Sequence, residues 1–379
     1  MPAYHQMGNN SENLVAEPEL EDFTGIILSP VNREPDVLSR DVAKFREQGQ
    51  FDVVFDPQLY LPKATRGKLP HQPYFPSDIE SADLSSLDWW KQVGDQVTEL
   101  SATLGVDTIA SPTIDPQVPS ADFYALVVDS GNHLSSSTSL RTLLTVMVTP
   151  SQVLEESSRM RYASILSRTK CDGLYLVFRW ERDGRREIIN RDEIVAALSF
   201  VQVLSQLGMQ LLVGFVGTEV PLLRAAGATD CATGKFMNLR RYSRQRFDDP
   251  PKRPGGRQLP YFFSEPLHGL IRAADVARLR ATGRSSWLDS AYGTNPFSEE
   301  IVAQLDSKPG TPWLATSWRQ FLWWFSKAAD TADTASSVLA LAEAQARWEE
   351  LEDAGVKFDE PDNDGRWLLS WQAALGELD

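Results

Sequence analysis

The chain has 379 residues, 42% hydrophobic and 23% charged, a composition typical of a folded protein with a large core. Its formal net charge of −15 opposes nonspecific attraction of the whole surface to nucleic acid or an anionic membrane, while leaving room for a local basic patch. The only two cysteines, Cys171 and Cys231, exclude a disulfide framework and indicate a reducing, cytoplasmic location.

Residues 1–23 are polar and acidic and carry no apolar signal sequence, so we expect a flexible or loosely docked lead-in. The longest apolar runs, 143–148 and 321–325, are too short to cross a bilayer, so no membrane association is expected.

Eight short apolar runs read as strands, nearly all separated by helical patterns. Their apolar character is typical of parallel strands buried on both faces. They lie at 25–32, 51–56, 106–111, 141–148, 173–178, 209–216, 228–232 and 260–265. This alternation predicts a (β/α)8 TIM-like barrel over residues 24–283. A doubly wound open sheet is the rival, weakened because no glycine-rich phosphate fingerprint follows an early strand.

Two other segments stand out. Residues 57–86 carry five prolines together with aromatic and basic residues, and we expect an ordered loop that covers the strand ends. Residues 284–379 hold eight of the eleven tryptophans and read as a helical extension. Those aromatic side chains form either the extension's own core or a docking face for a protein partner or a second copy of the chain.

Function in such a barrel lies at the carboxyl ends of the strands. Asp56, Gln58 and Tyr60 follow the second predicted strand, and Glu265 ends the eighth. Because these two strands would flank the first, Asp56 and Glu265 could pair as nucleophile or base and acid. The alternatives are that Asp56 caps its own turn and that Glu265 makes a loop salt bridge.

The segment 234–258 carries eight Lys and Arg residues against two Asp, a local charge of +6. It follows the seventh predicted strand, where barrels often bind phosphate. We expect Lys235, Asn238, Arg240 and Arg241 to hold phosphate, and Gln58, Tyr60 and Arg179 to contact and position a nucleotide or nucleic-acid ligand. A solvated charged loop, or a clamp onto acidic neighbours, is the alternative.

Metal sites have little support in the sequence. There is no zinc signature, since histidines and cysteines are few and lack metal-ligand spacing. Magnesium on Asp56, Glu219 or Glu265 stays open, because carboxylate sites for this ion leave little trace in a sequence.

The layout resembles the tRNA-guanine transglycosylases, barrel enzymes that exchange a guanine base. Asp56-Pro-Gln-Leu-Tyr60 is similar to the turn that carries one essential aspartate of that family, without its glycines. Gly227-Ala-Thr-Asp230-Cys231, with Arg240 and Arg241 beyond it, is similar to the stretch that carries the other. The resemblance implies a transferase with Asp56 and Asp230 as catalytic residues. The family's three-cysteine, one-histidine zinc site is absent from the sequence.

The leading interpretation is therefore a barrel enzyme acting on a nucleotide or nucleic-acid-like ligand. Its reaction would be base exchange or glycosidic-bond chemistry, with Asp56 as nucleophile or base and Asp230 or Glu265 as acid. The alternative is a non-catalytic barrel that serves as a subunit or adaptor through its C-terminal helices.

Overall fold

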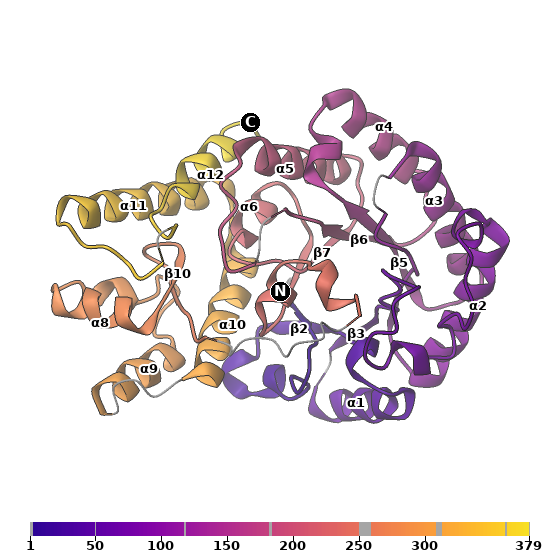
Figure 1. The fold of residues 1–379 in the computed structure, drawn as a ribbon, viewed down its shortest axis with the longest axis horizontal. Coiled ribbons are helices and arrows are strands. Elements are labelled where there is room, and N and C mark those ends of the chain that lie inside the picture. The colour runs from indigo at the N-terminus through magenta and orange to yellow at the C-terminus, as the bar shows by residue number, and fades with distance from the viewer. Residues whose placement is uncertain are drawn as a thin grey trace.

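The computed structural model describes residues 3–49, 51–116, 119–181, 184–249, 259–307, 313–360 and 362–378. Eight parallel strands pair in chain order and close into a barrel (Figure 1). They are β1 (Ala3–Gln6), β2 (Phe23–Ile27), β3 (Asp52–Phe55), β4 (Thr108–Ala110), β5 (Arg141–Val148), β6 (Gly173–Phe178), β7 (Leu211–Gly214) and β8 (Asp230–Thr233). The predicted fold class, a (β/α)8 barrel with a helical extension, is confirmed.

The predicted lead-in over residues 1–23 is wrong, because it supplies the first barrel strand. β1 pairs with β2 on one side and with β8 on the other, where His5 lies opposite Thr233. The strand contains His5 and Gln6, both fully buried. Its polar residues conceal it from a search for apolar runs.

The predicted eighth strand at 260–265 is also wrong. Residues Phe262–Ser264 form β9, which pairs antiparallel with β10 (Gly269–Ile271) in a separate two-stranded sheet. Phe263 is buried against Trp324, with ring centroids 3.9 Å apart, and its amide and carbonyl both bond to Gln320. The aromatic run thus belongs to the core of the extension, which starts before residue 284.

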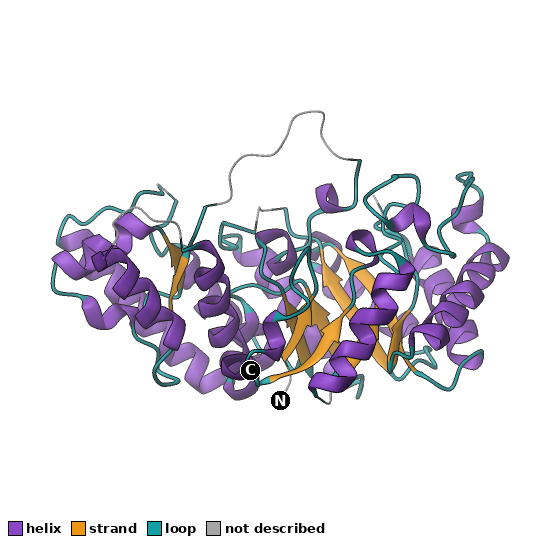
Figure 2. Cartoon of the chain, turned by 90° about the horizontal axis from the view of Figure 1, so that it is seen from below, coloured by secondary structure: helices purple, strands orange, loops and turns teal. Residues whose placement is uncertain are grey.

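Helices cover the outside of the barrel and make up most of the extension (Figure 2). The first group is α1 (Pro35–Gln48), α2 (Leu87–Leu104), α3 (Ala121–Ser136), α4 (Glu156–Leu166), α5 (Arg191–Gln206), α6 (Val220–Ala225) and the short α7 (Met237–Arg240). The second is α8 (Ala273–Ala281), α9 (Pro296–Ser307), α10 (Leu314–Thr331), α11 (Thr334–Asp353) and α12 (Trp367–Leu375). Helix α2 ends at Gly105, whose φ of 70° is the left-handed conformation that glycine adopts readily.

The extension completes the outer layer of helices around the barrel. Helix α10 packs against β1, β8 and α6, so it takes the place of an outer helix after β8, while α12 packs on α5. Six of its eight tryptophans are buried, and Trp287 and Trp318 are partly buried. The tryptophans therefore form the extension's own core. No described helix is long and apolar enough to cross a membrane.

Candidate anion-binding cleft

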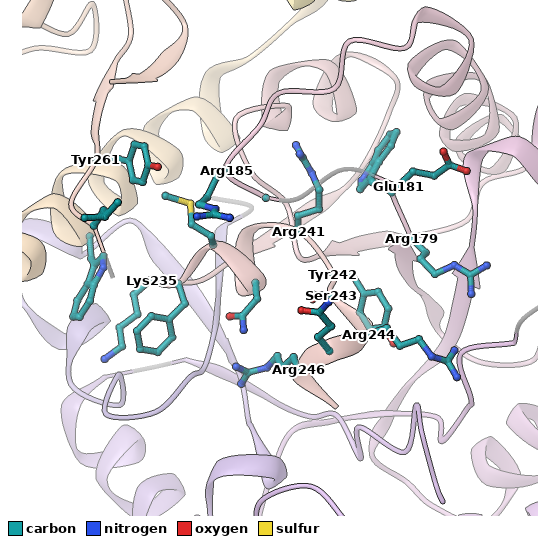
Figure 3. A pocket seen from close by; sticks show the side chains of 18 of the residues that line it. Arg179, Glu181, Arg185, Lys235, Arg241, Tyr242, Ser243, Arg244, Arg246 and Tyr261 are labelled. Carbon is teal, nitrogen blue, oxygen red and sulfur yellow. The ribbon is translucent and has the colours of Figure 1, made fainter. Parts of the chain in front are cut away.

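A cleft of about 880 Å³ opens at the carboxyl end of the barrel, between the loops after β5, β6 and β8 and the start of α10 (Figure 3). Among the described residues, eight charged side chains line it, seven cationic and one acidic. They are Arg66, Arg179, Arg185, Lys235, Arg241, Arg244, Arg246 and Glu181. The predicted ligand-binding residues Arg179, Lys235, Asn238 and Arg241 are among the lining residues, so the structure brings them together.

Arg240 does not line the cleft. Its guanidinium lies 3.6 Å from the centre of the Phe321 ring and donates to the carbonyls of Gly234 and Lys235. Burial without a carboxylate lowers its pKa to about 9. Gly234 is needed at this turn, because a Cβ there would lie 2.5 Å from the Leu239 side chain. Arg240 thus holds the turn that presents Lys235.

Lys235 follows β8 and is 4% exposed. Its Nζ donates to the carbonyl of Asn10 at 2.6 Å and lies 4.7 Å from the ring centres of both Phe236 and Trp318. Burial is the main cause that lowers its pKa to about 8. The ion pairs closer than 4 Å among the described residues do not include Lys235, so its charge has no close carboxylate there.

Asp115 organises the opposite wall. Its carboxylate accepts from Arg179 at 2.7 Å, from Arg244 at 3.1 Å and from the Tyr242 hydroxyl at 3.2 Å. The side chain is only 2% exposed, so the two arginines enclose it and project from it toward the cleft. Asp115 lies beyond the end of β4 in a stretch with no motif, and sequence reasoning gave it no such role.

Arg241 also has acidic neighbours behind it. One guanidinium nitrogen lies 3.6 Å from Glu219, and the arginine interacts electrostatically with Glu187. Burial raises the pKa of Glu187 to about 7, against the opposing influence of Arg241 and of a hydrogen bond from Thr218. Arg241 is therefore partly neutralised.

Arg246 and Arg66 close the cleft over the centre of the barrel. Arg246 donates to the Ser29 hydroxyl at 3.3 Å, and its Nε is a buried nitrogen with no partner among the described residues. Burial and, to a smaller extent, the neighbouring Arg66 lower its pKa to about 10. Arg66 donates to the carbonyl of Arg246 at 3.2 Å. Two guanidinium groups thus lie close together, an arrangement that an anion would stabilise.

Asp56 lies under this layer and does not reach the cleft. It is 1% exposed, and its carboxylate accepts from the Gln58 amide at 2.9 Å and the Tyr60 hydroxyl at 2.8 Å. Burial raises its pKa to about 6, against the opposing effect of these bonds. Tyr60 in turn packs on Tyr242 and Phe247. The turn-capping alternative for Asp56 describes this geometry.

Gln58 and Tyr60, predicted to contact a ligand, are likewise internal. Gln58 has a φ of 54°, and its side-chain oxygen accepts from the Ser29 hydroxyl and the Val31 amide, both at 3.3 Å. The loop 57–86 is ordered as predicted, with Tyr74 buried and its hydroxyl bonded to the Pro57 carbonyl at 2.7 Å.

The three predicted catalytic carboxylates do not converge. Asp230 is the first residue of β8, at the end of the strand opposite to the cleft, where it interacts with Arg141 and Arg224. Glu265 lies in the extension and accepts a hydrogen bond from Ser290. The predicted pairing with Asp56 depended on residues 260–265 being a barrel strand, which they are not.

No group of three or more His, Cys, Asp or Glu side chains among the described residues is arranged to hold a metal ion. Asp56, Glu219 and Glu265, the residues left open for magnesium, lie apart from one another in the fold. Residues 251–258 of the predicted phosphate-binding segment, with three of its cations, lie outside the described residues.

No protein-family model and no curated protein matches the chain. Among solved structures, it is similar to a GH18 chitinase from Pseudoalteromonas aurantia at 12% identity, with 63% of this chain and 95% of that chain covered and a TM-score of 0.37. It is also similar to a dihydrodipicolinate synthase from Thermotoga maritima at 11% identity, with 100% of this chain and 98% of that chain covered and a TM-score of 0.37. A glycoside hydrolase family 3 β-N-acetylglucosaminidase from a Paenibacillus species is similar at 10% identity, with 92% of this chain and 67% of that chain covered and a TM-score of 0.40. At these values the fold assignment rests on the strand pairing itself.

Proposed function

We propose that the cleft binds a small phosphate-bearing ligand of the nucleotide class. The observation that supports this is the charge of the described lining, where seven of eight ionic side chains are cations in a chain of net charge −15. Arg179, Arg241 and Arg244 have carboxylates behind them. Arg66 and Arg246 are in no ion pair closer than 4 Å within the described chain, and they are the residues to which we assign the phosphate groups.

The cleft also suits the rest of a nucleotide. Its volume of about 880 Å³ lies within the usual range of small-molecule sites. Trp180, Tyr242 and Tyr261 line it, and such rings stack on bases without strong sequence preference. Glycosidic-bond chemistry by paired carboxylates has no support in this geometry, because Glu181 is the one acid among the described lining residues. We therefore assign a nucleotide-class ligand to the cleft and do not assign glycosidic-bond chemistry to it.

The test is titration calorimetry with a nucleoside triphosphate, the matching nucleoside and inorganic phosphate. We expect the triphosphate to bind more tightly than the nucleoside by at least about a hundredfold, since two or three charge-assisted contacts are lost without the phosphates. The double variant Arg66→Gln/Arg246→Gln is expected to lose most of this preference. Arg366→Gln, at a side chain that is 70% exposed, is the matched control. Equal affinity for the triphosphate and the nucleoside, or an unchanged double variant, contradicts the proposal.

A further inference from the structure

Lys235 is unlike the other lysines of the described chain. Lys68, Lys91 and Lys327 pair with carboxylates and have side chains that are 32–45% exposed, and Lys170 and Lys357 are exposed. Lys235 is 4% exposed and lies between two aromatic rings at the wall of a cleft. An amine in such a place is desolvated, and desolvation favours its neutral, nucleophilic form.

The Lys235 amine makes one hydrogen bond within the described part of the chain, and this bond leaves the nucleophile available. Its partner is the Asn10 carbonyl oxygen, which can only accept. The neutral amine can keep this bond through one of its N–H groups while its lone pair stays free. The lowered pKa of about 8 means that roughly one-fifth of the amine is neutral at pH 7.4, against about one in a thousand for an ordinary lysine.

Lys235 also lies where the functional residues of a barrel are expected. Lys235 comes two residues after the end of β8, at the functional end of the barrel, and Figure 3 shows it across the cleft from Arg179. Two independent elements fix its surroundings, because Phe236 belongs to the barrel loop and Trp318 to α10. Arg240 holds the Lys235 carbonyl from behind. The amine is therefore preorganised rather than free to seek solvent.

We propose that Lys235 condenses with the carbonyl group of a phosphate-bearing aldehyde or ketone to form an imine. The amine lone pair forms a bond to the carbonyl carbon, and the carbonyl oxygen takes up the proton that the nitrogen loses. In the resulting carbinolamine the carbon–oxygen bond then breaks, the hydroxyl leaves as water with the second proton of the nitrogen, and a carbon–nitrogen double bond remains. No oxidant or reductant is needed. This inference rests on the proposed anion binding for the phosphate and on the amine itself for the covalent step.

The test uses the full chain with pyridoxal 5′-phosphate as the probe, a phosphorylated aldehyde whose imine can be fixed with borohydride and located by peptide mass spectrometry. We expect labelling of Lys235 at least about tenfold above that of Lys170 or Lys357 at pH 7.4, with a dependence on pH centred near 8. Lys235→Arg keeps the charge and should abolish this label. Label spread evenly over exposed lysines, or unchanged total label in Lys235→Arg, overturns the inference.

Two further arms keep this test separate from that of the proposed function. Pyridoxal, which lacks the phosphate, should label Lys235 less than the phosphorylated probe does. Equal labelling by both supports the reactive amine and contradicts anion binding. Reversible binding of the phosphorylated probe, displaced by inorganic phosphate but leaving no label on Lys235, contradicts the amine and supports anion binding. The pH dependence is measured on the unaltered chain, so it does not depend on the folding of a variant.

Discussion

Replacing Asp115 by Asn tests how the cleft arginines are held. The Asp115 carboxylate accepts from Arg179, Arg244 and Tyr242 and is almost fully buried. Asn keeps the size but removes the charge, and its NH₂ group cannot accept from a guanidinium. Breaking a buried ion pair costs about 3–5 kcal/mol. The Arg179 and Arg244 side chains are 26% and 40% exposed, so water takes over part of their pairing. We expect the free energy of unfolding to fall by about 2–3 kcal/mol.

The assay is urea unfolding followed by tryptophan fluorescence, with the midpoint and the slope fitted separately. Asp129→Asn is the matched control, because Asp129 is an exposed acid on α3 and the substitution changes the formal charge equally. That control should stay within about 0.5 kcal/mol of the parent chain. A loss in Asp115→Asn no larger than in the control would refute the role assigned to this carboxylate.

Ligand affinity should move in the opposite direction. Removing one negative charge near the cleft makes an anion more favourable there by roughly 0.5–1 kcal/mol, or about two- to fivefold in affinity. Calorimetry with the triphosphate measures this. If affinity instead falls by tenfold or more, the carboxylate matters more for positioning Arg179 and Arg244 than for its charge, and the expected electrostatic gain in affinity is wrong.

Three other substitutions probe the framework of the fold. Arg240→Met leaves the Gly234 and Lys235 carbonyls without their donors, so we expect about 2–3 kcal/mol of lost stability by urea unfolding, and a loss below 0.5 kcal/mol would contradict this. Gly25→Ala places a Cβ 2.1 Å from the Tyr4 ring and should cost about 1–3 kcal/mol, whereas Gly49→Ala, with its nearest atom at 3.7 Å, should cost far less. Burial lowers the pKa of His268 to about 4, so its contribution to stability is full above pH 6.5 and falls as the pH drops from 6.5 toward 4. His268→Gln should flatten the acid-side decline in unfolding free energy, and an unchanged decline would disprove that assignment.

Much of the barrel could be predicted from sequence because seven of its strands are apolar runs buried on both faces. Strand β1 could not be predicted, because it contains the polar residues His5 and Gln6. Both are fully buried, and no local sequence pattern reveals that polar side chains are buried. The run at 260–265 was mistaken for a barrel strand because aromatic residues suit any buried strand, whichever sheet contains it. That one error also produced the expected pairing of Asp56 with Glu265.

For the cleft, local charge density was the useful signal. The basic segment after β8 predicted its location, and Lys235, Asn238 and Arg241 line it. Asp115 contacts Arg244 and Arg66 contacts Arg246, in both cases across more than a hundred positions, and a single sequence does not reveal such contacts. Arg240 shows that charge density can also mislead. This arginine lies in the basic segment, but its side chain packs on Phe321 inside the fold and does not line the cleft.

The distribution of charge also separates the ligand classes that the basic segment left open. The eight charges on the described lining residues sum to +6, so all the other residues of the chain together carry −21. A nucleotide places all its phosphates inside the cleft, within the screening length of about 8 Å at physiological salt. A long nucleic acid must continue past the rim, along a chain whose remaining residues together carry a net negative charge. Repulsion outside the cleft then opposes attraction inside it, and a short, phosphate-dense ligand is the one for which the attraction is not offset.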